Sequence, residues 1–323
     1  MSFTIVKHFA VASLALLISA CGDSGFDKKT GKTLYQEATQ QLYADNAQYN
    51  FKADISVDTD AENPMLADLK VKLSGAVDNN AQRYELLPEV EAAVFNLKMP
   101  MRIDIKNKEL LLDTSHVIDA ALMFAPQAKK QLQQYKNKFI RFSPDNFKLY
   151  KDDMAEAMLI VSEVVKIGTG AMNEYIKIIP ESSIEKLPLD DKAKQLGAKA
   201  VLKAKLDREQ SQALQQHINT YIRDRVAAND KLSDEIKQNV LEVLVETEND
   251  SSYESSEAVI YLDSEGRIIH ETNMFNYEAE GEQLNVSMTV NYSNYGKASF
   301  TITPDKDQIR NFTEEDMHAL QNL

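Results

Sequence analysis

Residues that commonly build catalytic and metal sites are scarce in this chain. Its single cysteine, Cys21, leaves no second thiol for a disulfide within the chain. Its four histidines beyond the N-terminal segment are far apart and lack acidic neighbours at metal-ligand spacing. A Gly-x-Ser-x-Gly nucleophile motif is also missing from the sequence. We therefore expect no metal, no cofactor and no enzymatic activity. The histidines in question are His116, His217, His270 and His318.

Positive charge is also in short supply. The 323 residues contain 36 Lys and Arg against 50 Asp and Glu, a net charge of −14. This excess of negative charge disfavours binding to nucleic acids and electrostatic attraction to anionic lipid headgroups.

Long hydrophobic runs are limited to the N-terminus, where residues 9–20 are apolar apart from Ser13 and Ser19. Twelve helical residues extend about 18 Å, which is well short of a bilayer core of roughly 30 Å. The run follows the basic residue Lys7 and ends in small residues. Residues 1–20 therefore have the pattern of a cleavable signal peptide rather than a membrane span.

The signal segment ends in Ile18-Ser19-Ala20-Cys21, which resembles the lipobox of bacterial lipoproteins. The resemblance implies that the Cys21 thiol carries a diacylglyceryl group and that cleavage makes this residue the acylated N-terminus. Two or more acyl chains, such as palmitate, give stable anchoring where one does not. Gly22 follows the cysteine where inner-membrane retention needs an aspartate, so the resemblance implies an outer-membrane protein facing the periplasm. The alternative is a chance cysteine after an ordinary signal peptide.

The following residues predict a flexible tether and then an α+β domain. Residues 21–32 are polar and fit a tether, and residues 33–47 fit a helix with Leu34, Ala38 and Leu42 on one face. Strict apolar–polar alternation over residues 49–58 and 69–77 then predicts antiparallel strands with one covered face. We expect one domain over residues 33–310 and a tail helix over 311–323. Its fold would be a curved antiparallel sheet, an open half-barrel, covered by helices.

The middle and end of the chain predict helices followed by a meander. Gly168-Thr169-Gly170 is expected to interrupt a long helix, residues 180–188 to form a linker, and residues 246–257 to form an exposed acidic loop. Asp207 and Gln210 have the spacing of a capping box before another helix. Alternation over residues 258–302 predicts four strands, the last containing Ala298, Phe300 and Ile302.

Two stretches resemble the LolA-like superfamily of lipoproteins and lipoprotein carriers, which includes the LppX/LprG-type lipoproteins. One is residues 35–77, ending in Leu73-Ser74-Gly75, and the other is residues 259–305, with Asn294-Tyr295-Gly296-Lys297 and Ile302-Thr303-Pro304. The resemblance implies a bent half-barrel closed by helices, with acyl chains held in the gap. The helical middle of this chain is longer than expected for the family, so the alternative is that extra helix fills the gap.

Two functions follow from these features. The first is a lipid-anchored envelope protein that binds or carries lipid or lipoprotein acyl chains in the half-barrel. The second is a structural lipoprotein with a filled core, which binds an envelope protein through an edge strand or the acidic loop. If a cavity exists, the apolar strand residues are expected to line it. They are Tyr49, Phe51, Ile55, Val71, Leu73, Ile103, Val286, Met288, Val290 and Phe300.

The lipobox makes a direct prediction for the Cys21→Ser variant. The thiol is the nucleophile for the thioether bond, so the variant should lose its lipid and leave the membrane fraction. Membrane fractionation and intact mass compare it with the parent protein. Retention of both the acyl mass and the membrane association would contradict lipidation at Cys21.

Overall fold

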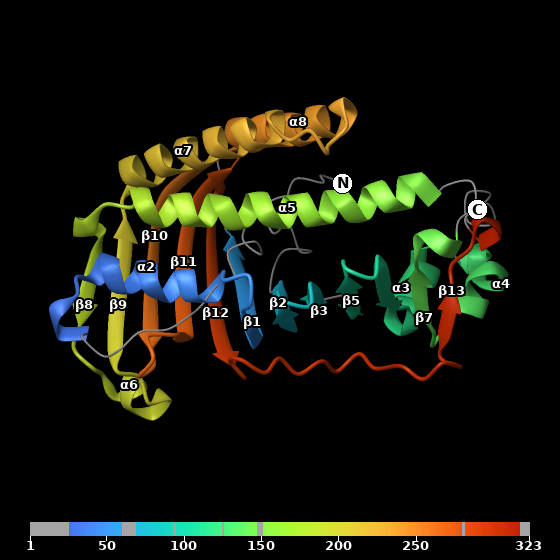
Figure 1. Ribbon diagram of the computed structural model, residues 1–323, viewed down its shortest axis with the longest axis horizontal. Coiled ribbons are helices and arrows are strands. Elements are labelled where there is room, and N and C mark those ends of the chain that lie inside the picture. Colours follow the sequence, from blue (N-terminus) through green and yellow to red (C-terminus); the bar gives the residue numbers. More distant parts are fainter. Residues whose placement is uncertain are drawn as a thin grey trace. The chain divides into compact units, whose positions relative to one another are not determined.

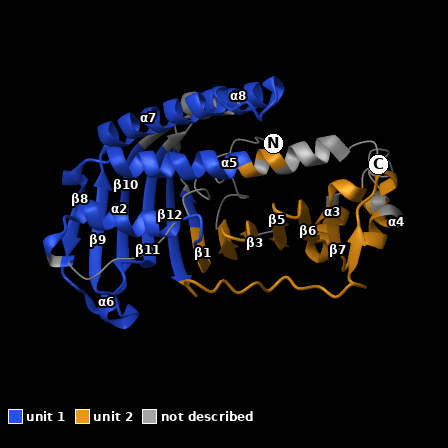
Figure 2. Cartoon of the chain, in the orientation of Figure 1, with its two compact units in different colours: residues 1–47, 56–63, 163–292 blue, residues 48–55, 64–162, 293–323 orange. Residues whose placement is uncertain are grey.

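The computed structural model describes residues 26–59, 69–92, 95–124, 126–146, 151–279 and 282–316. Residues 21–25 of the predicted tether, including Cys21, lie outside this range, as does most of the predicted tail helix. The rest of the predicted tether is structured, with a short 3-10 helix over Phe26–Lys28 and the start of a longer helix at Gly31. The prediction of a flexible tether is therefore wrong for residues 26–32. The chain divides into two compact units (Figure 2). Unit 1 comprises residues 1–47, 56–63 and 163–292, and unit 2 comprises residues 48–55, 64–162 and 293–323. Each unit combines helices with an open, mostly antiparallel arrangement of strands, so the predicted α+β class is confirmed.

In unit 1 the strands follow the order β12-β11-β10-β9-β8, and all neighbouring strands pair antiparallel. In Figure 1, α2 and the C-terminal part of α5 cross the face of these strands. The strands are β8 (Ile184–Leu187), β9 (Ala200–Leu206), β10 (Ser251–Leu262), β11 (Ile268–Ala279) and β12 (Glu282–Ser293). The helices are α2 (Gly31–Leu42), α5 (Lys151–Ile178, which begins in unit 2), α6 (Asp191–Leu196), α7 (Arg208–Ala227) and α8 (Asp234–Asp250).

Local sequence signals start the helices of unit 1. The Thr30 hydroxyl accepts a hydrogen bond from the Thr33 amide and caps α2. Helix α2 then buries Leu34, Ala38 and Leu42, the face that the periodicity predicts. Asp207 and Gln210 form the predicted capping box at the start of α7.

The segment before α2 lies along strand β8. The Lys186 ammonium donates to the carbonyl oxygens of Phe26 and Lys29, at 2.9 and 3.0 Å. At Gly31 a β-carbon would approach the Ile184 carbonyl oxygen to 2.8 Å, so only glycine fits without displacing the strand. These contacts fix residues 26–31 beside the last strand of the unit 1 sheet.

In unit 2 the strands follow the order β13-β7-β6-β5-β3-β2-β1. Strand β13 runs parallel to β7, and the pairings from β7 to β2 are antiparallel. The strands are β1 (Gln48–Thr59), β2 (Lys70–Asp78), β3 (Arg83–Ala92), β4 (Phe95–Lys98), β5 (Met101–Asp104), β6 (Glu109–Asp113), β7 (Phe139–Phe142) and β13 (Ile309–Asn311). Helices α3 (Ser115–Phe124) and α4 (Lys129–Leu132) belong to this unit, as does the beginning of α5.

The predicted helix interruption at Gly168-Thr169-Gly170 is wrong, because α5 is continuous from Lys151 to Ile178. A β-carbon at Gly170 would overlap the hydroxyl of Tyr221 on α7. This glycine therefore permits close packing of the two helices.

Three further predictions in the second half are also wrong. The expected linker, residues 180–188, contains a short 3-10 turn and strand β8. The expected acidic loop, residues 246–257, is the end of α8 followed directly by β10. The expected last strand through Ala298, Phe300 and Ile302 is irregular. The polar composition of these segments did not predict their secondary structure, because contacts with residues distant in sequence outweigh local propensity.

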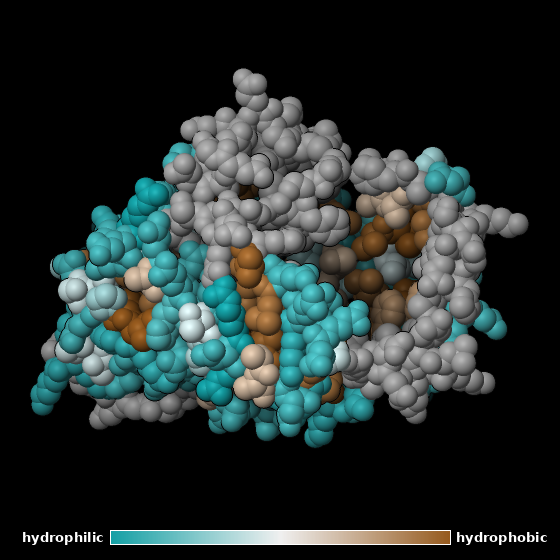
Figure 3. Space-filling view, turned by 90° about the horizontal axis from the view of Figure 1, so that it is seen from above, coloured by the Kyte–Doolittle hydropathy of each residue, from teal (hydrophilic) through white to brown (hydrophobic). Residues whose placement is uncertain are grey.

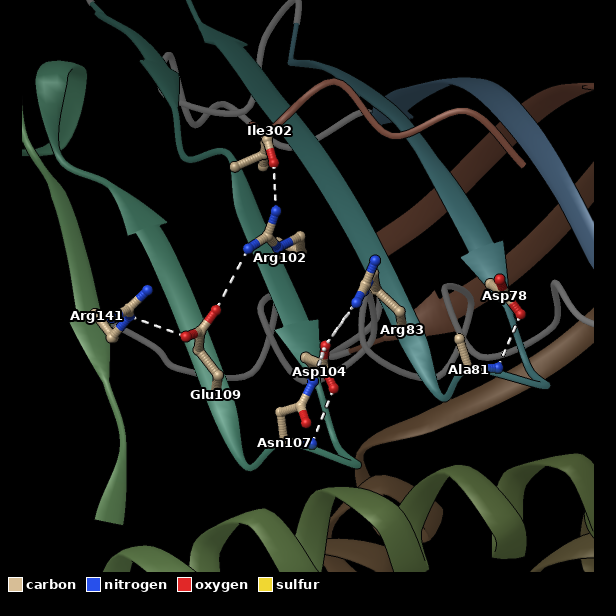
Figure 4. Close-up of polar contacts among 9 residues, drawn as sticks. All are labelled: Asp78, Ala81, Arg83, Arg102, Asp104, Asn107, Glu109, Arg141 and Ile302. Carbon is tan, nitrogen blue, oxygen red and sulfur yellow. Dashed lines mark hydrogen bonds and ion pairs between the residues drawn. The ribbon is translucent and has the colours of Figure 1, made fainter. Parts of the chain in front are cut away.

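One face of the unit 2 sheet carries a network of ion pairs (Figure 4). Arg83 on β3 contacts Asp104 on β5 at 3.1 Å. Glu109 on β6 joins Arg102 on β5 and Arg141 on β7, at 3.3 and 2.9 Å. These five side chains make this the charged face of the sheet.

Residues 294–305, here called the strap, lie against this charged face. The Glu85 side chain, only 1% exposed, accepts hydrogen bonds from the Thr301 amide at 2.8 Å and the Ile302 amide at 2.6 Å. It also accepts from the Thr301 hydroxyl at 2.7 Å. Arg102 donates to the Ile302 carbonyl oxygen at 2.6 Å (Figure 4). Side chains thus supply the hydrogen bonds that a neighbouring strand would give.

Asn50 on β1 fixes the beginning of the strap in the same way. Its side-chain amide donates to the Ser299 carbonyl oxygen at 2.7 Å and accepts from the Ser299 amide at 2.8 Å. The Asn294 side chain donates to the same Asn50 oxygen at 3.0 Å.

Replacing Glu85 with alanine should therefore be costly. The change removes the acceptor of the buried Ile302 amide and of the partly buried Thr301 amide, and we expect a loss of about 2–4 kcal/mol in the free energy of unfolding. Glu89→Ala is the matched control, because Glu89 is on the same strand but more exposed and paired with Lys98. Its loss should stay below about 1 kcal/mol. Equal losses in urea denaturation would contradict the anchoring role of Glu85.

Candidate functional site

The second face of the unit 2 sheet is apolar. Residues in register on neighbouring strands share a face, and the pairings of β2, β3, β5, β6 and β7 align two apolar rows. One row is Val77, Tyr84, Ile103, Leu110 and Phe142, and the other is Gly75, Leu86, Met101, Leu112 and Ile140. Val71 and Leu73 continue the same face along β2. We call this set the apolar face.

Much of the apolar face remains partly exposed. Val71, Leu73 and Ile103 are half-buried, whereas Leu111, on the charged face, is 0% exposed. In the space-filling view a hollow with a hydrophobic floor opens on the right, the side on which unit 2 lies in Figure 2 (Figure 3). Most side chains of the apolar face are therefore partly exposed, although Val77 and Ile140 are buried.

The predicted cavity residues divide between the units. Val286, Met288 and Val290 belong to β12 in unit 1, and the other seven belong to unit 2. Met288 and Val290 are fully buried, and Val286 is half-buried.

Within unit 2, three predicted residues, Val71, Leu73 and Ile103, share the apolar face, and a fourth, Phe51, packs against Gly75 on β2. The Phe51 ring lies over Gly75, whose absent β-carbon would approach the ring to 3.0 Å and overlap the Glu85 carbonyl oxygen. Phe51 itself is buried, as are Tyr49 and Ile55 on the same strand.

Phe300 lies apart from this group. It is on the strap, and the Arg83 guanidinium lies 5.8 Å from its ring centroid. Because Arg83 points to the charged face, Phe300 lies on the opposite side of the sheet from Ile103.

A buried acid in unit 1 was not predicted from the sequence. Glu271 on β11 is in register with Ile260 on β10 and Val290 on β12, and Ile260 is in register with Leu202 on β9. All four side chains of this cross-strand row are buried. The acid therefore lies among apolar residues.

The environment of Glu271 favours its protonated form. Burial raises the pKa of this carboxyl to about 7, and hydrogen bonds from Tyr292 and Asn273 lower it by less. The Tyr292 hydroxyl donates to the carboxyl at 2.8 Å. Within the part of the chain that the structure describes, no cation forms an ion pair with Glu271.

Tyr35 on α2 is close enough to this carboxyl for the two groups to interact electrostatically. Burial, together with the nearby Tyr175, Glu271 and Tyr43, raises the pKa of Tyr35 on α2 well above its usual value. No local sequence pattern marks this cluster, because it depends on strand register and on which helices lie above.

His270, next to Glu271 in sequence, points to the other face of the sheet. Its Nδ1 lies 2.7 Å from the Asn291 side-chain oxygen, and its ring meets Tyr261 edge-on at 5.4 Å. Its Nε2 is buried and has no hydrogen-bond partner. Burial is the main cause that lowers the pKa of this histidine, so it is held neutral inside the fold.

Two surface grooves in unit 1 differ in character. A groove of about 300 Å³ between α2 and α5 has a largely amide lining, formed by Gln36, Gln40, Asn173, Ile176 and Lys177. This polar lining does not suit an acyl chain. A more open groove of about 550 Å³ along α8 is lined by Leu241, Val245 and four polar residues.

No protein-family model matches the sequence, and no curated protein matches it. Among the described helices, none combines the length and the apolar character needed to cross a membrane.

Replacing Glu271 with glutamine should stabilise the protein in a pH-dependent way. Because its folded-state pKa is raised, the folded protein holds a proton that the unfolded chain releases between about pH 4.5 and 7. Stability contributed by the protonated acid is thus lost as pH rises through this window. At pH 8 we expect Glu271→Gln to gain up to about 3 kcal/mol, and near pH 4.5 almost nothing.

Urea denaturation at the two pH values measures this gain. Glu257→Gln on β10 is the control, because Glu257 is paired with Lys203 at 2.7 Å and its replacement should give no gain. A Glu271→Gln gain that is the same at both pH values would argue against a buried, protonated acid.

Proposed function

We propose that this chain is a lipid-anchored protein of the bacterial cell envelope that binds acyl chains on the apolar face of unit 2. The observation that carries the proposal is the division of the unit 2 sheet into two unlike faces. Ion pairs and the strap occupy the charged face, and the apolar face keeps half-buried side chains such as Val71, Leu73 and Ile103. Partly exposed apolar surface of this kind suits a hydrophobic ligand.

The proposal includes the shape of the unit 2 sheet. We infer a half-barrel whose apolar face is its inner surface, with helices closing it. Support comes from α3, where Ile118 packs with Tyr135 and Ile140 at the β7 end of the face. A chain lying on such a surface would be held by burial alone, at about 0.8 kcal/mol for each CH₂ removed from water.

The charges also indicate how a ligand would be oriented. The ion-paired side chains of β3, β5, β6 and β7 point away from the apolar face. A fatty tail therefore fits this face, whereas a charged headgroup fits only at its margin.

The anchor and location rest on the lipobox. We propose that Cys21 is lipidated and that the protein faces the periplasm, most consistently with the outer membrane because Gly22 follows the cysteine.

The second candidate is an interaction lipoprotein with a filled core. Full burial of Tyr49, Phe51, Met288 and Val290, all predicted cavity residues, favours it. The α8 groove gives it a contact surface, since Val245 is 47% exposed there.

Lipid uptake by the Cys21→Ser chain tests the proposed function. We expect the protein to bind a fluorescent sixteen-carbon fatty acid and to release lipid in native mass spectrometry. Ile103→Asp places a charge on the apolar face and should weaken fatty-acid binding at least about tenfold.

Phe300→Ser is the matched control, because Phe300 lies on the charged face and its loss should leave fatty-acid binding unchanged. Circular dichroism confirms that both variants fold. A parent protein that takes up no fatty acid and carries no lipid would support the filled-core alternative instead.

A further inference from the structure

Helix α2 lies over the buried carboxyl of Glu271. It packs against β8 and β11, the strand that carries this residue. Tyr35 of α2 approaches the carboxyl, with Tyr43 just beyond the helix and Tyr175 of α5 near Tyr35. The carboxyl therefore lies under α2 and near Tyr35.

The sheet around Glu271 offers little to a negative charge. Tyr292 from β12 donates one hydrogen bond, and Asn273 on the same strand donates another. Ile260 on β10 and Val290 on β12, its cross-strand neighbours, are apolar. Within the described residues, no lysine or arginine from α2, α5, β10 or β12 pairs with it.

A carboxylate with so few partners is poorly solvated while α2 is in place. Lifting α2 from the sheet would admit water to the carboxyl and restore its ordinary hydration. Ionisation of the acid and release of the helix therefore favour each other, which is a proton linkage between one group and one element.

We propose that Glu271 is a proton-controlled latch for α2, holding the helix on the sheet when protonated and weakening its hold when ionised. The latch does not depend on acyl-chain binding. It acts on the first helix after residues 26–29, the segment that leads from the proposed membrane anchor.

The sign and size of the effect follow from the linkage. With α2 in place the pKa of Glu271 is about 7, and with α2 released it returns toward the value of an exposed glutamate. The equilibrium constant for docking should fall by up to about tenfold per pH unit between about pH 4.5 and 7.

Protonation of the nearby His270 cannot account for this pH dependence of α2. His270 faces Tyr261, Asn291 and Lys192 on the other side of the sheet, and its pKa is lowered, chiefly by burial. Its protonation weakens the fold as pH falls, which is the opposite direction.

Hydrogen exchange of the full-length protein at pH 5, 6 and 7 tests the latch. The opening constant of each helix is obtained after division by the intrinsic chemical exchange rate at that pH. For residues 31–42 we expect this constant to rise by up to about tenfold per pH unit. In Glu271→Gln it should not change with pH. Helix α7, which packs on β9 and β10, is the internal control. At amides of α7 that exchange through local opening rather than global unfolding, the constant should not change with pH.

Two outcomes would overturn the proposal. One is a pH dependence of α2 that is the same in Glu271→Gln as in the parent protein. The other is an equal change in α2 and in the locally opening amides of α7, which would mean that the pH effect is not specific to α2.

Tyr292→Phe provides a second, independent test. The hydroxyl of Tyr292 stabilises the ionised carboxylate, so its loss should raise the pKa of Glu271 further. The rise in the α2 opening constant should then continue above pH 7. If it levels off at the same pH as in the parent protein, the carboxyl that Tyr292 contacts does not control the helix.

Discussion

The alternation of side chains along the unit 2 strands is the constraint on which the rest of that unit depends. Because successive residues point to opposite faces, Arg83 and Tyr84 are neighbours in sequence but lie on different sides of the sheet. Every charge placed on one face leaves an apolar residue on the other. The ion pairs and the apolar face are therefore two results of one pattern, and a shift of one residue in register would exchange them.

Much of this pattern could be predicted from the sequence. The alternation of β2, the face of α2 through Leu34, and the Asp207 capping box depend on spacing within a few residues. Such signals are local, and the structure contains them as expected.

The remaining features depend on partners distant in sequence. The strap was predicted as a strand because Ala298, Phe300 and Ile302 alternate, yet its amides pair with Glu85, more than two hundred residues away. Gly170 was interpreted as a helix break, although the helix continues through it and the Tyr221 hydroxyl of α7 occupies the place of a β-carbon there. In the same way, Glu271 became notable only once strand register placed it beside Ile260 and Val290.

The contact between Lys186 and the carbonyl oxygens of Phe26 and Lys29 bears on self-association of the protein. Strand β8 is the last strand of the unit 1 sheet, and an open strand edge invites pairing with a second molecule. A protein anchored as proposed would diffuse in two dimensions, where encounters between copies are frequent. Residues 26–31 lie along β8, so in the anchored protein that we propose, the segment between the anchor and α2 would also hinder pairing at this edge.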